Sequence, residues 1–194
     1  SGQVDWCIPH IEGCTSVSAS GRHGWGFFLF KALMLPSAAF TAIFWVLCAQ
    51  WLHARAGTTT AMDRTILTLG LIGAAFLVLY STFLGTEGDV YRAMRRYGTV
   101  IYFGFTFLAQ LLLSHRARTL HPDVHVVRWM IGLGLFMLLE GLVLAALANL
   151  VEDDDWLENI SEWHFTTALT FYPVLTWQMW QRTGFTISFH SRDR

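Results

Sequence analysis

The sequence predicts an all-α membrane protein, a polytopic transmembrane helical bundle, from three observations. The chain of 194 residues is 54% hydrophobic and only 14% charged, well below the charge of about 25% in an ordinary soluble domain. Its apolar residues gather in runs that approach the roughly 20 residues needed to cross a hydrocarbon core as a helix. Aromatic residues reach 15%, which is typical of the belts at membrane–water interfaces.

Five apolar runs are expected to be spans. Pro36 in the first run predicts a kink or a late helix start, and Asp63 is expected to cap the helix of the second run. Gly70 and Gly73 in the second run permit neighbouring helices to approach closely. The expected spans are residues 25–52, 65–85, 97–114, 129–150 and 163–181.

The charges of the connectors predict how these spans are oriented. The connectors after the first and third spans and the C-terminal tail hold eight arginines against three acidic residues. The N-terminal segment and the other two connectors hold four arginines against ten acidic residues. The positive-inside rule therefore predicts an exoplasmic cap segment over residues 1–24, a bundle over 25–182 and a cytoplasmic tail over 183–194. An exoplasmic N-terminus without a visible signal predicts a sixth span or a cleaved signal upstream of Ser1.

Two cysteines of the cap segment, Cys7 and Cys14, lie close together in the sequence. In an oxidising compartment we expect a disulfide between them. Two alternatives stay open at this point: two reduced thiols, or half of a metal site that includes His10 but lacks a clear fourth ligand. The His121 and His125 pair has a spacing that suits a metal on a helix, but a third ligand is missing there too, so no metal site is predicted.

Arginines recur where the third span begins. Arg92, Arg95 and Arg96 are three and four residues apart, so they can share one face of a helix that enters the membrane. A basic face at head-group depth suits an anionic lipid head group, and Arg22 of the cap segment is a fourth candidate for it. Pairing with nearby acidic residues is an equally good explanation of these arginines.

Glu140 is an acidic residue deep in an expected span. An unpaired charge there costs several kcal/mol, so we expect Glu140 to be protonated, paired or in contact with a hydrated cavity. It is a candidate for a catalytic or supporting role. The alternative is a neutral carboxyl group that is hydrogen-bonded to a neighbouring helix through Gln110 or Gln178.

Glu162 and His164 open the last span at the exoplasmic interface. A carboxylate and an imidazole at this place are a candidate acid–base pair, although close neighbours on a helix point in different directions. The alternative is a helix-start acid that the helix dipole favours, next to an interfacial histidine. The preceding loop, within residues 151–164, contains six acidic residues and could instead be a docking surface for another protein.

Several classes of protein are not indicated, because the sequence lacks the motifs that are typical of them. The sequence contains no Gly-rich phosphate loop, no G-x-S-x-G elbow and no haem-attachment motif, so no cofactor is predicted. A net charge of −1 gives no reason to expect nucleic acid as a partner. Ser16, Ser18 and Ser20 are interpreted as loop formers rather than nucleophiles.

Two stretches resemble a known family. The first is C-T-S-V-S-A-S-G-R at residues 14–22, which runs directly into an apolar span, and the second is S-E-W at residues 161–163. They are similar to the P-S-I-S-x-T-G-type loop and the Glu-Trp signature of the FRAG/DRAM/Sfk family of six-span membrane proteins. R-Y-G-T-V at residues 96–100 is a looser match. Thr15 stands where the family has proline, and the acidic insertion is foreign to it.

The resemblance implies lipid-related work, because the family includes a factor in fatty-acid remodelling of GPI anchors and proteins that tune phosphoinositide or sterol handling. A chain rich in arginine with a single lysine is typical of a bacterium, which predicts the bacterial inner membrane. Our first hypothesis is a protein that binds or remodels a lipid or glycolipid of the outer leaflet, as a binder or as an acyltransferase or hydrolase. The second is a non-catalytic accessory or scaffold subunit of a larger membrane complex.

Overall fold

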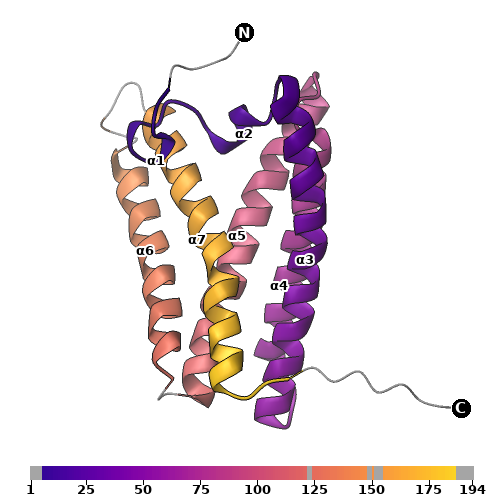
Figure 1. Ribbon diagram of the computed structural model, residues 1–194, viewed down its shortest axis with the longest axis vertical. Coiled ribbons are helices and arrows are strands. Elements are labelled where there is room, and N and C mark those ends of the chain that lie inside the picture. Colours follow the sequence, from indigo (N-terminus) through magenta and orange to yellow (C-terminus); the bar gives the residue numbers. More distant parts are fainter. Residues whose placement is uncertain (1–5, 122–123, 148–149, 151–154, 187–194) are drawn as a thin grey trace, which may run out of the picture.

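Five long helices run up and down the molecule, with two short helices across one end (Figure 1). The computed structural model describes residues 6–121, 124–147, 150 and 155–186, and contains no strand within them. The predicted all-α class is thereby confirmed. The helices are α1 (Pro9–Glu12), α2 (Val17–Ser20), α3 (Gly24–Ala56), α4 (Ala61–Phe83), α5 (Asp89–Leu120), α6 (His125–Leu147) and α7 (Asp155–Arg182).

Four of the described helices, α3 to α6, are long and apolar enough to cross a membrane. They indicate an integral membrane protein. The fifth expected span falls in α7, which is long enough at 28 residues. However, α7 contains no stretch as apolar as those in α3 to α6, because threonine, tryptophan and glutamine recur along it.

Local sequence signals explain where the helices begin and end. The Thr60 hydroxyl accepts the Asp63 N–H at 3.3 Å and the Asp63 carboxylate accepts the Thr60 N–H at 2.8 Å, so Asp63 caps α4 as expected. Gly57 ends α3 in the left-handed conformation that glycine adopts most easily. The expectation of a late helix start near Pro36 is wrong, because α3 begins at Gly24 and continues through this proline.

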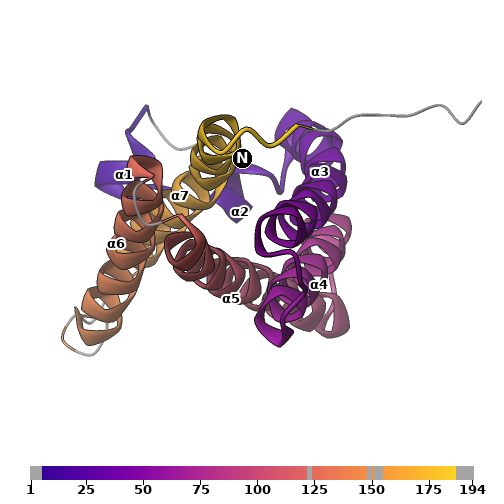
Figure 2. The same ribbon diagram turned by 90° about the horizontal axis from the view of Figure 1, so that it is seen from below.

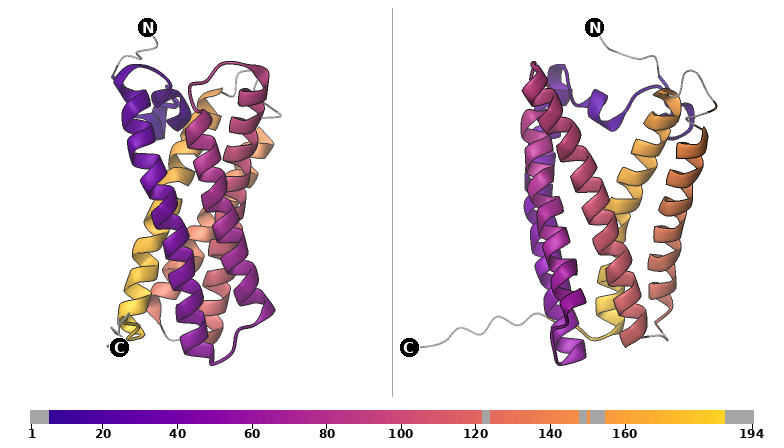
Figure 3. Two further views of the ribbon diagram at one scale, coloured as in Figure 1. Left: turned by 90° about the vertical axis from the view of Figure 1, so that its right-hand side faces the viewer. Right: turned by 180° about the vertical axis from the view of Figure 1, so that it is seen from behind.

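The path of α5 links two groups of helices. Figure 3 shows α5 running diagonally, beside α3 and α4 where the short helices lie and beside α6 and α7 at the opposite end. We call the end that carries residues 6–23 the cap end, and the end with the α3–α4 loop and His121 the base. The view from below shows α5 between the two groups (Figure 2).

The largest hydrophobic core lies toward the base. It includes the fully buried Trp51 together with Met130 and Met179 from the later helices. Gly70 of α4 lies directly against the Trp45 indole ring, where a Cβ atom would overlap the ring. The close approach expected of Gly70 is therefore present, and it seats α3 on α4.

Candidate functional site

The cap segment is bound to the start of α7. The Asn159 side chain donates a hydrogen bond to the Gly13 carbonyl at 2.7 Å, and the Trp163 indole N–H donates to the Thr15 carbonyl at 2.8 Å. Gly13 is in the left-handed conformation, and a Cβ atom there would overlap the Trp156 carbonyl. Glycine is therefore required for the segment to lie this close to α7.

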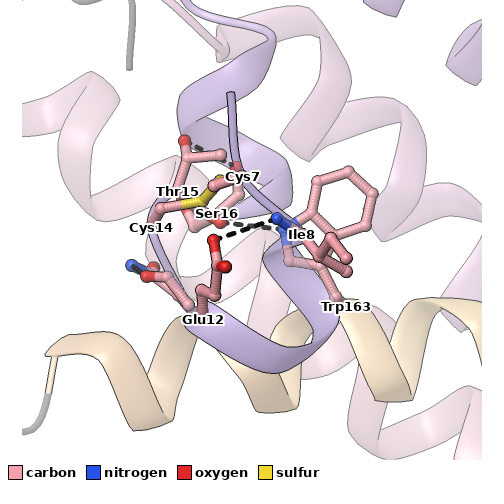
Figure 4. Close-up of a disulfide and its surroundings, with 9 residues drawn as sticks. Cys7, Ile8, Glu12, Cys14, Thr15, Ser16 and Trp163 are labelled. Atoms are coloured by element: carbon pink, nitrogen blue, oxygen red, sulfur yellow. Dashed lines mark hydrogen bonds between the residues drawn. A yellow bond between two sulfur atoms is a disulfide. The ribbon is translucent and has the colours of Figure 1, made fainter. Parts of the chain in front are cut away.

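A disulfide joins Cys7 to Cys14 and encloses α1, with the two Cα atoms 6.7 Å apart (Figure 4). The disulfide prediction is confirmed. Glu12 lies beside the two sulfur atoms and accepts the Ile8 N–H at 3.1 Å. The imidazole of His10, the third member of the alternative metal site, is hydrogen-bonded instead to Thr167 of α7 at 3.0 Å.

Below the disulfide, two serines of the cap segment meet Glu162 of α7. The Ser16 hydroxyl caps α2 by accepting the Ala19 N–H at 3.0 Å, and it lies 3.0 Å from the Ser18 hydroxyl. Glu162 accepts the Ser18 N–H at 3.1 Å and also interacts with the Ser16 hydroxyl. Arg22 donates to the Ser18 hydroxyl at 3.1 Å. The two stretches that carry the family resemblance are thus in direct contact, although they are 144 residues apart.

An apolar cavity of about 480 Å³ lies below α2, between α3, α4, α5 and α7. Glu162 is the only charged residue among the described residues that line it. Ser37 and Phe40 of α3 and Thr170 of α7 line the cavity and are also exposed on the outer surface. The cavity therefore opens sideways between α3 and α7. Its lining further includes Val17, Phe30, Met34, Leu77, Tyr102 and Leu169.

Three buried polar atoms of the cavity wall have no hydrogen-bond partner within the described chain. They are the Trp45 indole nitrogen and the hydroxyl groups of Thr106 and Thr166. A buried polar group without a partner is costly, and most such groups in proteins are satisfied. Each of these atoms has almost no accessible surface, so they are unsatisfied groups within the wall and a molecule in the cavity does not reach them directly.

A second, polar pocket of about 340 Å³ lies at the cap end, between α2, α4 and α5. It brings together all four arginines that were predicted to hold an anionic head group. They reach it from different elements, Arg22 from the cap segment and the other three from the first turns of α5. The arginines that line it are Arg22, Arg92, Arg95 and Arg96.

These arginines are not equivalent. Arg95 donates hydrogen bonds to the carbonyls of Phe83 and Thr86, where α4 ends, and so satisfies groups that a helix terminus leaves unpaired. Arg92 lies 3.7 Å from Asp89, an exposed pair of the kind that contributes little. Arg96 has no hydrogen-bond or ion-pair partner within the described residues. Arg95 therefore has a structural role, while Arg96 and the weakly paired Arg92 can bind an anion.

Tyr80 of α4 forms a wall common to both cavities. Its ring is buried, packs edge-on against Phe30 at 5.9 Å and lines the apolar cavity and the arginine pocket alike. Its hydroxyl interacts with the Ser18 side chain. Gly98 of α5 lies against the Tyr80 backbone, since a Cβ atom there would be 3.1 Å from the Tyr80 Cα. The close helix contact thus fixes Tyr80 between the two cavities.

Glu140 and His164 are hydrogen-bonded to each other between α6 and α7, with 13% and 32% of their side chains exposed. Glu140 is therefore paired, as one of its expected states required, but its partner is not Gln110 or Gln178. The structure does not bring Glu162 and His164 together. Because they are two residues apart on a helix with about 3.6 residues per turn, they point to nearly opposite sides of α7, Glu162 toward Ser18 and His164 toward α6.

Ser16, Ser18 and Tyr80 are members of the site that the sequence did not predict. The signal for the two serines is the Ser-x-Ser stretch of the resemblance, whose composition is typical of a loop. The possible docking surface lies mainly at residues 151–154, outside the described residues. Compared with protein families, characterised proteins and solved structures, the chain has no match.

Proposed function

We propose that this protein binds an anionic lipid of the outer leaflet, with the head group in the arginine pocket and an acyl chain in the apolar cavity. The single observation that carries the proposal is that one residue, Tyr80, lines both cavities. An amphiphile needs a polar site and an apolar site in contact with each other, and the two are adjacent here. A cavity of about 480 Å³ is also within the range of roughly 300–1,000 Å³ that is typical of small-molecule sites.

The proposal includes α7 as a fifth membrane crossing. Its side chains support this, because Phe171, Val174 and Trp177 are exposed apolar residues that would face lipid. Several of its polar residues are engaged within the protein: Glu162 faces the cap, and Thr170 and Thr176 donate to their own helix at 2.7 and 3.1 Å. Such internal bonds lower the cost of placing hydroxyl groups in a membrane. At about 1.5 Å per residue, α7 is also longer than a hydrocarbon core of about 30 Å.

The orientation and the family are part of the same proposal. The charges of the connectors put the cap end on the exoplasmic side, and a disulfide between Cys7 and Cys14 suits an oxidising compartment. The family is supported by the contact between residues 14–22 and the Glu162-Trp163 pair, because the two stretches that carry the FRAG/DRAM/Sfk resemblance form one site. We propose a member of this family in a bacterial inner membrane, with a lipid as its ligand.

The test is mass spectrometry of the lipids that remain on the purified protein. Arg92 and Arg96 are both changed to glutamine, while Arg95 is kept because of its role at the end of α4. The matched control changes Arg64 and Arg118, two exposed arginines near the base, so that the same charge is lost elsewhere.

We expect one anionic lipid class to be enriched on the wild type and on the control, and to fall at least about tenfold in the Arg92/Arg96 variant. Charge-assisted hydrogen bonds of this kind contribute about 1.5–3 kcal/mol. Bulk lipid composition on all three proteins, or an equal loss in both variants, would refute the proposal. A protein partner that co-purifies in place of lipid would favour the scaffold hypothesis.

A further inference from the structure

We propose that Ser18 is a nucleophile that accepts the acyl group of the bound lipid, with Ser16 and Glu162 as the path for its proton. This inference rests on the proposed lipid site and extends it from binding to chemistry. It is based on three observations. The hydroxyl groups of Ser18 and Ser16 and the Glu162 carboxylate form a row beneath the cap, Arg22 donates a hydrogen bond to Ser18, and Ser18 lies between the two cavities.

The hydrogen bonds allow a proton to be transferred from Ser18 through Ser16 to Glu162. The Ser16 oxygen already accepts the Ala19 N–H at 3.0 Å, which leaves it one further acceptor site and its own proton. That site can take the Ser18 proton at 3.0 Å, while the Ser16 proton can be donated to the Glu162 carboxylate, which can only accept when ionised. Ser18 thus has a base within reach through one intervening hydroxyl group.

Arg22 places a positive charge beside the Ser18 oxygen. A serine hydroxyl is a weak nucleophile unless a base or a positive group activates it. The guanidinium of Arg22 donates to the Ser18 oxygen at 3.1 Å, so it stabilises negative charge that develops there. The Tyr80 hydroxyl, which also interacts with Ser18, is a second donor that could serve the carbonyl oxygen of an ester.

Ser18 lies where the ester bond of a bound lipid would be. Ser18 lines the arginine pocket, whereas Glu162 and the adjacent Val17 line the apolar cavity. A lipid with its head group in the first and its chain in the second passes beside Tyr80 and Ser18, with the ester linkage between the two cavities. The scissile carbonyl is thereby brought to the Ser18 hydroxyl.

The first step is the attack of the Ser18 oxygen on the ester carbonyl. A bond forms between this oxygen and the acyl carbon, and the bond from that carbon to the lipid alcohol breaks. The Ser18 proton moves to Ser16 as the Ser16 proton moves to Glu162, and the same path returns a proton to the departing alkoxide. Water or the hydroxyl group of a second lipid then takes the acyl group from Ser18, which gives hydrolysis or acyl transfer.

Helix capping alone does not account for this arrangement. The cap of α2 uses one acceptor site of Ser16 and needs neither Ser18 nor Arg22. Ser20, in the same short helix, shows what a purely local serine looks like, because its hydroxyl donates to the Val17 carbonyl at 2.7 Å and lines neither cavity. Ser20 is therefore the matched control.

The experiment treats the protein in nanodiscs with hexadecyl fluorophosphonate, whose chain suits the apolar cavity and whose phosphorus a nucleophilic serine attacks with loss of fluoride. We expect labelling at Ser18, located by peptide mapping, and none there in Ser18→Ala. Glu162→Gln should slow labelling about 10²–10⁴-fold, the usual size of a general-base effect, and Ser20→Ala should label like the wild type. Helical circular dichroism confirms that each variant is folded.

Lipid retained on the same samples separates the two proposals. If the wild type and Ser18→Ala keep the anionic lipid but the wild type is not labelled at Ser18, the nucleophile is refuted and the lipid site stands. Labelling that is unchanged in Glu162→Gln would refute the proton path. If the wild type holds no enriched lipid, the proposed function fails and this inference fails with it. Labelling at Ser18 that depends on Glu162 supports it.

Discussion

The two ends of the bundle hold a carboxylate in opposite ways. At the base, Asp63 is almost fully buried and its carboxylate is saturated by the Arg116 guanidinium at 3.0 Å and by the Thr60 backbone. At the cap end, Glu162 is only half-buried, and its partners are the Ser18 backbone N–H and the Ser16 hydroxyl. The first arrangement closes a helix contact, whereas the second leaves a carboxylate beside hydroxyl groups that can exchange protons.

The apolar packing differs in the same sense. Around Trp51 the side chains of several helices meet without accessible surface. Around Tyr80 the helices separate, and the apolar cavity of about 480 Å³ lies between them. Dense packing supplies stability, while an open cavity lowers it and gives room for a ligand. The comparison indicates that stability is concentrated at the base and chemistry at the cap end.

The largest effect is expected from the base core. Trp51→Ala removes a fully buried indole ring together with its hydrogen bond to Thr183 at 3.0 Å, and should lower the free energy of unfolding by about 4 kcal/mol. Reversible unfolding in detergent, followed by circular dichroism, measures the loss. Trp25→Ala, in which an 89% exposed ring is removed, should change it by less than about 1 kcal/mol. Equal losses in the two variants would mean that the base is not the stable end.

Next in size is the loss of the Asp63 charge. Asp63→Asn leaves the Arg116 guanidinium, with only 17% of its side chain exposed, without its anion, and should cost about 3 kcal/mol. Glu162→Gln should cost less than about 1 kcal/mol in the same assay, because an amide can still bond to Ser16 and Ser18. If Glu162→Gln proved the more damaging change, the contrast between the two acidic residues would be reversed.

A smaller effect is expected at the helix contact of Gly70. Gly70→Ala places a Cβ atom into the Trp45 ring, which is fully buried and cannot move freely, so we expect a loss of about 2 kcal/mol. Gly104→Ala in α5 is the control, because nothing lies within 4 Å of the added atom. Thermal unfolding of both variants checks this. A Gly104→Ala variant that is as unstable as Gly70→Ala would argue against steric overlap as the cause.

The smallest effect on the bundle is expected from the disulfide. Changing both Cys7 and Cys14 to serine opens a short disulfide loop. Closure of this loop stabilises its folded conformation by about 2 kcal/mol. Because the loop lies outside the long helices, the unfolding of the bundle should change by less than about 0.5 kcal/mol. Proteolysis within residues 6–23 should become faster while the helices stay protected. A melting temperature that falls as far as in Gly70→Ala would show instead that the cap supports the bundle.

The sequence could predict what depends on neighbouring residues. Helix periodicity, the Asp63 cap, the disulfide and the common face of Arg92 and Arg96 all follow from short spacings. Pairs between distant helices do not, because apolar helices can pack in many registers. The partnership of Glu140 with His164 is such a pair, since the sequence shows only that a buried acid needs a partner.

The serine site was hidden for a related reason. Ser16 and Ser18 have the composition of a loop, and their hydroxyl groups gain significance only when α7 brings Glu162 to them. Tyr80 in turn looks like an ordinary aromatic residue of a span until two cavities are found on either side of it. Positions of this kind require the tertiary fold.

The sideways opening between α3 and α7 determines the route by which a ligand would reach the site. A lipid that enters past Phe40 and Thr170 never leaves the hydrocarbon region, so its tail is not exposed to water on the way. Occupancy would then follow the mole fraction of that lipid in its leaflet rather than any concentration in solution. The lipid would reach the opening by two-dimensional diffusion. A shortage or surplus of that lipid in the surrounding membrane would therefore change the occupancy of the site beneath the cap.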